Sequence, residues 1–416
     1  MTTLEADTET SEERAFRDEA RTWLGANAAR RHHDTSEFKR RVAAAGRSDE
    51  DEPAHVEACR AWQRQLSDAG FAGISVPSEY GGRGASPALE RVWRQEVGRY
   101  EVDTGVFAVA LGMVVPTLLV HGTEEQKHRF IAPTLRGDEV WCQLFSEPGA
   151  GSDLAGLTTR AVRDGDEWVV NGQKVWNSFA HFADWGILLA RTDWDVPKHR
   201  GISYFLVDMR TPGVEARPLR QITGVAHFNE TFLTDVHIPA DQLLGALNGG
   251  WGVAQTTLMN ERALISGGGS GIGFRDYVEL ARHYGCTQDP EIRQRLAAAY
   301  TRFEILKWIG QRAQAAMRAG RPLGPEGSVA KLAVSEHTAR NGDLALAVEG
   351  AHGMLSGRDA YEEGFWQQQF LGQWGIRIGG GTEQVQRNIL GERVLGLPPE
   401  PRPDKTEPFR DIPKNS

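Results

Sequence analysis

The sequence predicts an α+β protein in which an N-terminal α-helical domain and a C-terminal α-helical bundle flank a middle antiparallel β domain. Apolar residues recur at helical spacing near the start, the middle is rich in Val, Thr, Trp and Phe, and the helical period returns after Gly249-Gly250. A chain of 416 residues is long enough for two or three domains. We therefore expect a helical domain over residues 1–137, a β-sheet domain over 138–245, a helical bundle over 246–400 and a frayed tail over 401–416.

The first domain shows the period of amphipathic helices. Phe16, Ala20 and Leu24 lie four residues apart, a second such run covers residues 62–71, and a long apolar stretch covers residues 106–120. These runs predict helices that bury one face each.

The middle region carries turn signals between β-rich segments. Asp164-Gly165 and Asn171-Gly172 each suit a two-residue hairpin turn, which predicts a β-meander through residues 158–178. After it, Leu296, Tyr300 and Phe303 resume the helical period of the last bundle.

Composition excludes several classes of partner. The net charge of −9 argues against nucleic acid and anionic membranes, and neither an export signal nor a long apolar run is present, so we expect a cytoplasmic protein. Three scattered cysteines, Cys59, Cys142 and Cys286, favour reduced thiols over a disulfide framework. The pair His32 and His33 lies in a charged stretch, so no metal site is expected.

The segment Ser146-Glu147-Pro148-Gly149-Ala150-Gly151-Ser152-Asp153 is rich in glycine and hydroxyl groups. Glycine exposes backbone amides and hydroxyls add donors, so the segment could hold a phosphate or the edge of a flavin. An ordinary surface turn is the alternative, and no GxGxxG fingerprint is present.

A second segment, Asn171-Gly172-Gln173-Lys174-Val175-Trp176-Asn177-Ser178, contains an aromatic ring and a hydroxyl two residues apart. On a regular strand Trp176 and Ser178 share one face and could form a wall beside a planar cofactor. A Trp in the core of the sheet is the alternative.

Five segments resemble the acyl-CoA dehydrogenase family in the same order and at similar spacing, over roughly residues 12–400. They are Tyr80-Gly81-Gly82, Thr123-Glu124-Glu125-Gln126-Lys127, the two segments above, and the stretch from Gly381 to Arg393. The resemblance implies FAD bound where the sheet meets the last bundle.

The resemblance also assigns residues to the cofactor and the substrate. Ser146 and Ser152 correspond to hydroxyls along the flavin and its pyrophosphate, with Ser152 also near the substrate, and Trp176 to the ring that packs on the flavin. Ser178 corresponds to the hydroxyl near flavin N5. Thr382 and Gln384 correspond to contacts at the adenosine end, although Thr382 also suits a helix N-cap.

The family removes a proton from the carbon alpha to a thioester and passes hydride from the beta carbon to flavin N5, giving a 2-enoyl-CoA. Many members take the base from a Glu before a late Gly-Thr pair, but that position is Gly380 here. Gly380 can still donate its backbone amide to the thioester carbonyl. Members resembling the isovaleryl-CoA type place the base on an earlier helix, directly before an arginine, which matches Glu261 and Arg262. We expect Arg262 to be a substrate-binding residue.

Glu261 is also singled out by its position. Ala254, Leu258, Glu261 and Ile265 lie on one helical stripe, and the other members of that stripe are apolar. Partial desolvation raises the pKa of a carboxyl group toward a range that suits proton abstraction. The alternative is a structural ion pair with Arg262 or another partner.

The resemblance implies a homodimer or homotetramer, an acyl-CoA substrate and an electron-transferring flavoprotein as reoxidant. Two other functions stay open: a flavin-dependent oxidase or monooxygenase on the same fold, and a non-catalytic subunit of a heteromeric dehydrogenase. Altered motifs at Ala281–Gly285 and Val348–Gly353 leave the contacts between subunits uncertain. The sequence does not specify the acyl chain, nor whether the thioester is formed with CoA or with a carrier protein.

Overall fold

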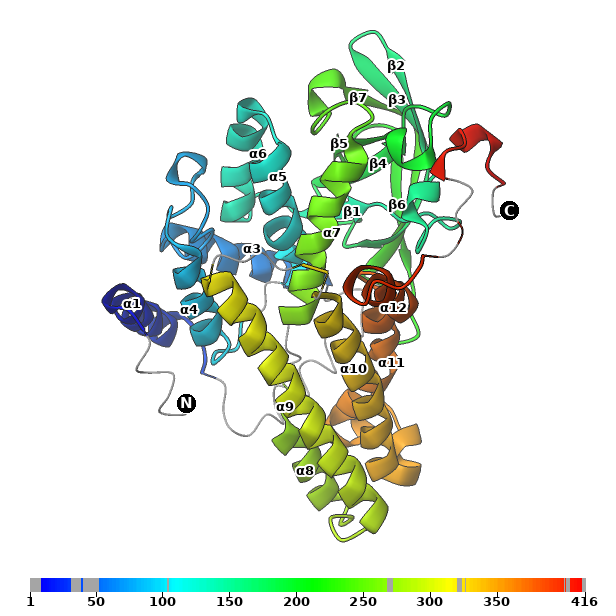
Figure 1. Ribbon diagram of the computed structural model, residues 1–416. Coiled ribbons are helices and arrows are strands. Elements are labelled where there is room, and N and C mark those ends of the chain that lie inside the picture. The colour runs from blue at the N-terminus through cyan, green and yellow to red at the C-terminus, as the bar shows by residue number, and fades with distance from the viewer. Residues whose placement is uncertain are drawn as a thin grey trace.

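A computed structural model shows two helical regions and a β-sheet region, with helix α7 running between them (Figure 1). The structure describes residues 9–30, 39, 52–102, 105–267, 272–319, 324–325, 327–399, 401 and 405–413. His32 and His33 lie outside these residues.

The N-terminal region is helical, as expected. Helix α1 begins after Thr10, whose side chain accepts from the backbone amide of Glu13 while the Glu13 carboxylate accepts from the Thr10 amide. Phe16, Ala20 and Leu24 are all buried, which confirms the predicted stripe. The α-helices of this region are α1 (Ser11–Asn27), α3 (Glu52–Asp68), α4 (Pro87–Val97), α5 (Val115–His121) and α6 (Glu124–Arg136), and a π-helical turn (Ala110–Val114) precedes α5.

The middle region is a twisted sheet of seven strands among the described residues, in the order β1-β4-β2-β3-β7-β6, with β5 also paired to β4. Most pairs are antiparallel, but β1 runs parallel to β4, as does the short contact of β2 with β4. The strands are β1 (Trp141–Leu144), β2 (Arg160–Asp164), β3 (Glu167–Ser178), β4 (Trp185–Arg191), β5 (Ile202–Asp208), β6 (Val214–Leu219) and β7 (Phe228–Pro239).

One of the two predicted hairpins is present. Asp164 pairs with Glu167, so the β2–β3 turn consists of Gly165 and Asp166, one residue later than expected. The predicted turn at Asn171-Gly172 is wrong, because β3 continues through it with a bulge and pairs with β7, which is distant in sequence.

A glycine is needed at position 172 for a steric reason and not for a turn. A Cβ atom at Gly172 would lie 2.4 Å from the Thr159 Oγ1 atom, so the glycine allows close packing of neighbouring backbones. A dipeptide that favours turns here serves a bulge inside a strand, and the predicted meander reduces to one hairpin.

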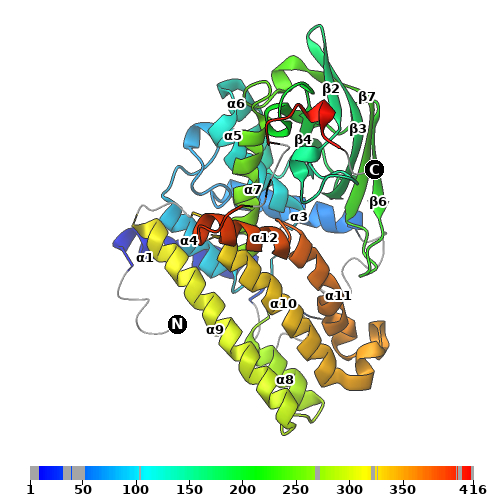
Figure 2. The ribbon, with the colours of Figure 1, turned by 45° about the vertical axis from the view of Figure 1, so that its right-hand side comes forward.

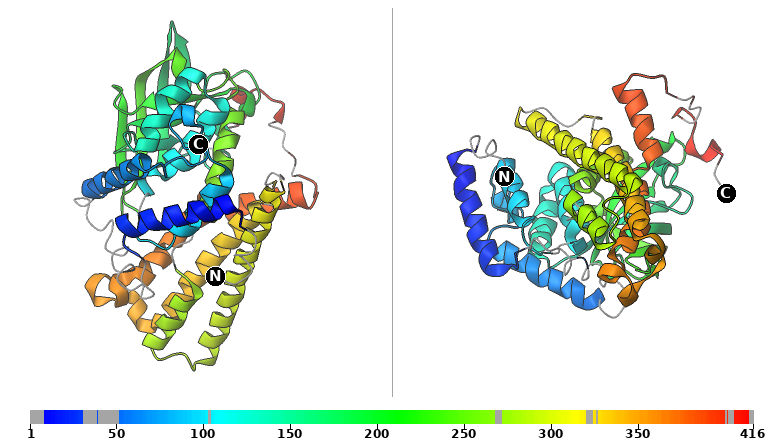
Figure 3. Two further views of the ribbon diagram at one scale, coloured as in Figure 1. Left: turned by 90° about the vertical axis from the view of Figure 1, so that its left-hand side faces the viewer. Right: turned by 90° about the horizontal axis from the view of Figure 1, so that it is seen from below.

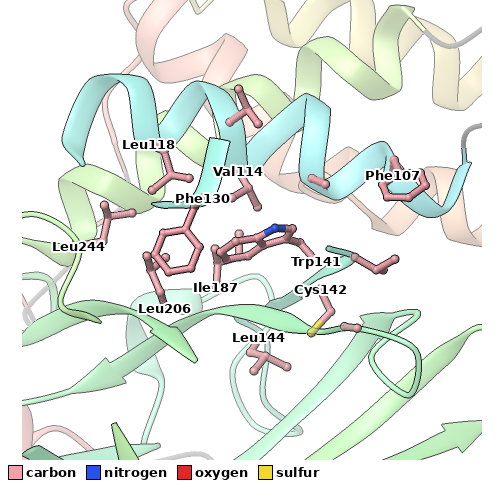
Figure 4. Packing of buried hydrophobic residues seen from close by; sticks show 14 of the residues in the cluster. Phe107, Val114, Leu118, Phe130, Trp141, Cys142, Leu144, Ile187, Leu206 and Leu244 are labelled. Atoms are coloured by element: carbon pink, nitrogen blue, oxygen red, sulfur yellow. The ribbon is translucent and has the colours of Figure 1, made fainter. Parts of the chain in front are cut away.

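The main core lies between the N-terminal helices and the sheet. Phe130 of α6 meets Trp141 of β1 edge-on, with ring centroids 5.4 Å apart, and Ile187 and Leu206 pack from β4 and β5 (Figure 4). The Trp141 indole donates to the Thr134 hydroxyl at 2.9 Å, so burial of this large ring leaves no unsatisfied polar atom on it.

The C-terminal region is a helical bundle that extends away from the sheet (Figure 3). Helix α7 packs on β5, α5 and α10, so it connects all three regions. The helices are α7 (Gly250–Gly267), α8 (Phe274–His283), α9 (Pro290–Arg318), α10 (Gly327–Glu349), α11 (Phe365–Ile378) and α12 (Glu383–Ile389).

The end of the chain differs from the frayed tail that we expected. Residues 405–413 contain a short helical turn (Phe409–Asp411), and the Phe409 side chain is buried. The described part of this tail is therefore packed against the protein. No helix among the described residues is long and apolar enough to cross a membrane.

Glu96 provides a test of the N-terminal helical region. Its carboxylate is fully buried and accepts from Arg17 of α1, from Arg21 at 2.8 Å and from Arg99 at 3.0 Å. Glu96→Gln removes the charge that these guanidinium groups share, so we expect the free energy of unfolding to fall by about 3–5 kcal/mol. Urea denaturation at neutral pH measures this free energy. The control is the more exposed ion pair of Glu19 with Arg83: Glu19→Gln should lower the free energy of unfolding by less than about 1 kcal/mol.

Candidate active site

Glu261 lies on α7 and faces two other parts of the molecule. Its Oε2 atom accepts from the Gln143 amide of β1 at 3.4 Å, and the Gly380 backbone amide beyond α11 forms a second hydrogen bond. Burial raises the pKa of Glu261 above its ordinary value, whereas these two hydrogen bonds and the positive charges of Arg262 and Lys331 partly oppose the shift.

Glu261 forms no ion pair within 4.0 Å in the part of the chain that the structure describes. The expected alternative, a structural pair with Arg262, is therefore not the arrangement found. The arginine is half-buried, and burial lowers its pKa while Glu261 acts in the opposite direction. The result is a partly desolvated carboxylate held by neutral donors.

The glycine turn after α11 presents the Gly380 amide. Gly380 and Gly381 have φ angles of +64° and +89°, in the left-handed region that favours glycine. The fully buried Gln386 side chain donates to the carbonyl oxygens of both residues, at 3.0 and 3.3 Å. A Cβ atom at Gly381 would lie 2.7 Å from that amide nitrogen, so the turn and Gln386 are fitted to each other.

Lys331 of α10 holds the start of this turn. Its fully buried ammonium donates to the Ile376 carbonyl at 2.9 Å, to the Arg377 carbonyl at 3.4 Å and to the Ser335 hydroxyl at 3.1 Å. The last carbonyls of a helix carry partial negative charge, which a cation stabilises. Lys331 therefore fixes the end of α11 and places a positive charge near Glu261.

The end of strand β3 adjoins Glu261 through Gln143. The Asn177 side chain donates to the Gln143 backbone carbonyl at 2.7 Å, so β3 contacts β1 at the residue that lies between Trp176 and Ser178. Trp176 is left unpaired by a bulge, has a φ of +66° and exposes 60 % of its surface. Because of this bulge, side chains of β3 do not simply alternate between the two faces of the sheet here. The Trp176 ring lies at the surface and not in the core.

The 146–158 loop is closed by a buried ion pair. The Glu147 carboxylate accepts from the Lys174 ammonium at 2.9 Å and from the backbone amides of Thr158 and Thr159 at 2.7 and 2.8 Å. Burial opposes ionisation of Glu147, but Lys174 and these donors outweigh it and lower the pKa to about 2. The loop thus has a rigid base, above which Ser146 is half-buried and Ser152 is exposed.

The remaining predicted residues lie on α12. The Thr382 hydroxyl accepts from the Val385 amide at 3.2 Å, so Thr382 caps the helix as its alternative role required. Gln384 is exposed on the first turn. Within the described chain, neither residue forms a hydrogen bond with the Glu261 carboxylate.

A planar cofactor with phosphates suits these residues. The exposed Trp176 ring offers a face for stacking. The space around Gly151 is open where a side chain would be, so backbone amides and the Ser152 hydroxyl can be reached.

Sequence reasoning missed three contributors: Gln143, Lys331 and Gln386. Gln143 is a polar residue inside an apolar strand, and Lys331 is a lone charge within an apolar part of α10, so both carried a weak signal. Their partners come from distant segments, which the pattern of one segment does not reveal.

Family models match the chain in three consecutive parts. The acyl-CoA dehydrogenase N-terminal domain matches residues 10–138, the middle domain residues 142–236 and the C-terminal domain residues 248–395. The three matches fall on the helical, β-sheet and helical regions described above.

Curated relatives and solved structures agree. The chain is 39 % identical over 394 residues to the acyl-CoA dehydrogenase IpdE1 of Mycobacterium tuberculosis, covering 92 % of this chain and 98 % of that protein. It is 42 % identical over 348 residues to FadE34 of the same organism, covering 83 % of this chain but 47 % of that protein.

Among solved structures, the Tcur3481-Tcur3483 steroid ACAD has a TM-score of 0.78 at 30 % identity, covering 94 % of this chain and 99 % of that one. The ChsE4-ChsE5 complex of M. tuberculosis has a TM-score of 0.72 at 30 % identity, with coverage of 94 % and 99 %. With all three domain models matched in order, this chain belongs to the acyl-CoA dehydrogenase family, whose members are flavin-dependent oxidoreductases.

Proposed function

We propose that Glu261 removes the alpha proton of an acyl-CoA thioester in an FAD-dependent dehydrogenation that yields a 2-enoyl-CoA. The observation that carries the proposal is a carboxylate with a raised pKa, held by Gln143 and the Gly380 amide and not by a cation. A base of this kind gains a proton more readily than a solvated carboxylate does.

Other carboxylates nearby are committed to structural pairs. Glu147 is bound to Lys174, and Glu383 accepts from Arg377 at 2.8 Å. A pair of this kind stabilises the ionised form and lowers the pKa, as it does for both residues, which makes them weak bases. Glu261 is the carboxylate of this region whose pKa is raised instead.

Gly380 is proposed to contribute its backbone and not a side chain. An alpha proton becomes acidic when the thioester oxygen receives aimed donors. The Gly380 amide is oriented by the left-handed turn and by Gln386. If the thioester oxygen takes this amide, Glu261 loses one hydrogen bond that lowers its pKa, and it becomes a stronger base when substrate is bound.

The proposed cofactor residues are Ser146, Ser152, Trp176, Ser178, Thr382 and Gln384, with Ser152 and Arg262 toward the substrate. Bound FAD supplies the acceptor for the hydride that leaves the beta carbon. An electron-transferring flavoprotein is the proposed reoxidant. Similarity to a steroid ACAD favours a bulky, ring-bearing acyl group, and the absence of a side chain at Gly380 is compatible with one.

The first test is anaerobic mixing of the FAD-loaded protein with straight, branched and ring-bearing acyl-CoA thioesters. We expect flavin bleaching and formation of an enoyl-CoA, fastest with the ring-bearing thioester. Glu261→Gln keeps the shape of the side chain but cannot accept the proton, so bleaching should slow by about a hundredfold or more while FAD stays bound. Glu291→Gln, an exposed change on α9, is the matched control.

Unchanged bleaching in Glu261→Gln would remove this residue from the mechanism. A flavin that no thioester reduces, but that reacts with oxygen after reduction by NAD(P)H, would instead support the oxidase or monooxygenase alternative.

The pH dependence provides a second test. Glu261 must be ionised to act, so kcat/KM should fall as pH falls through its pKa, which burial raises above 4.5. The positive charge of Lys331 lowers that pKa, so Lys331→Met should move the acid limb to higher pH. Lys307→Met, which changes an exposed lysine on α9, should leave the acid limb at its wild-type pH. An acid limb that does not move in Lys331→Met would contradict the assignment of Glu261.

A second candidate role is that of one subunit in a two-protein dehydrogenase. Two related structures are named for pairs of proteins, Tcur3481-Tcur3483 and ChsE4-ChsE5, and α9 exposes Tyr300, Ile305 and Trp308 by 50 %, 43 % and 57 %. Large exposed apolar side chains on one helix indicate an interface.

We expect the purified chain to form a dimer or tetramer by light scattering. A homo-oligomer that is active alone excludes the two-protein role. Binding of FAD that requires co-expression with a second acyl-CoA dehydrogenase-type chain establishes it.

A further inference from the structure

We infer that the tail segment, residues 405–413, is a positioning element for the cofactor. Phe409 covers a buried guanidinium, Arg191, that holds the last third of the 146–158 loop. The inference rests on the proposed function, because that loop is assigned to FAD there. It gives the C-terminal end of the chain a role in cofactor retention.

Arg191 lies at the end of β4 and is fully buried. Its guanidinium donates to three carbonyl oxygens: Ala155 at 2.6 Å, Leu157 at 3.1 Å and Lys198 at 3.0 Å. The Arg191 backbone amide donates to the Thr159 carbonyl oxygen at 2.7 Å. Arg191 therefore binds the last third of the loop at two points, Ala155 and Leu157, and binds Thr159, which directly follows the loop, through its backbone amide.

The guanidinium has no carboxylate within ion-pair distance in the described chain, although Glu147, Asp153 and Asp193 act on it from further away. A buried cation without a counterion depends on carbonyl dipoles and on exclusion of competing water. Whatever covers Arg191 therefore determines how firmly it holds the loop.

Phe409 provides that cover. Its ring centroid lies 3.4 Å from the Arg191 Cζ atom, its surface is only 3 % exposed, and the Trp194 ring packs beside it at 5.3 Å. The position is set by two backbone hydrogen bonds, from the Phe409 amide to Val196 at 2.9 Å and from the Arg410 amide to Trp194 at 3.0 Å. Figure 2 shows this segment, in red, lying against the β region.

A second connection joins the same places. Lys198, whose carbonyl accepts from Arg191, extends its ammonium to both oxygens of Asp153 at 2.9 Å. Asp153 directly follows Ser152, the exposed hydroxyl assigned to the cofactor. The segment on which the tail rests therefore also holds the tip of the loop.

Loss of the ring should admit water to Arg191 and loosen residues 151–158 without touching Glu261. A cation covered by an aromatic ring is held more firmly than one that water can reach, so we expect Phe409→Ala to weaken FAD binding by roughly tenfold. Phe409→Leu keeps apolar cover but loses the π face, and should weaken binding less. Arg410→Ala, which removes only an exposed pair with Asp195, is the control and should bind FAD normally.

Two measurements test the inference. FAD affinity is obtained by titrating apoprotein with FAD and following flavin fluorescence, and loop protection by hydrogen exchange of residues 151–158 in the FAD-free protein. Weaker FAD binding with faster exchange in Phe409→Ala, restored flavin reduction at saturating FAD and unchanged behaviour of Arg410→Ala support the inference.

Normal FAD affinity and normal exchange in a folded Phe409→Ala protein overturn it. If that variant unfolds, Phe409→Leu decides in the same way: wild-type exchange and affinity overturn the inference, and a smaller defect in both supports it. A wild-type chain that binds no FAD would refute the proposed function. The effect of Phe409 on the loop would still be measured, because hydrogen exchange of residues 151–158 is followed in the FAD-free protein.

Discussion

The proposed site depends on keeping one carboxylate, Glu261, partly buried without pairing it to a cation. Water-depleted surroundings raise the pKa of Glu261, and an adjacent lysine or arginine in direct contact would reverse that shift. The protein instead supplies neutral donors, the Gln143 amide and the Gly380 backbone, and keeps the Lys331 ammonium occupied by carbonyl oxygens. The positive charge is present nearby, but its hydrogen bonds go elsewhere.

This arrangement explains why the three regions must meet. Gln143 comes from β1, Glu261 from α7 and Gly380 from the turn after α11, and Asn177 of β3 joins the group through the Gln143 carbonyl. Packing of α7 on β5, α5 and α10 sets their separation. Buried ion pairs elsewhere, such as Glu147 with Lys174, hold loops in place and do not need a carboxylate with a raised pKa.

Much of the fold followed from local patterns. The buried stripe at Phe16, Ala20 and Leu24, the β2–β3 hairpin and the α7 stripe around Glu261 each depend on periodicity within one segment. The turn at Asn171-Gly172 could not be judged in this way, because the reason for the glycine is its contact with Thr159, the residue before β2. The same holds at the proposed site: Glu261 was predicted from the pattern of its own helix, whereas Gln143, Lys331 and Gln386 are identified only by partners far along the chain. The tail was predicted to fray because Pro-rich ends usually do, but burial of Phe409 on Arg191 outweighs that composition.

The most direct test of the central claim separates proton removal from redox chemistry. An acyl-CoA analogue with an acidic alpha proton, but with sulfur in place of the beta carbon, can be deprotonated and cannot lose hydride. On the FAD-loaded wild-type protein its enolate should give a long-wavelength charge-transfer band, which Glu261→Gln should abolish although the analogue still binds. An equally strong band in the variant would show that another group removes the proton and would contradict the account.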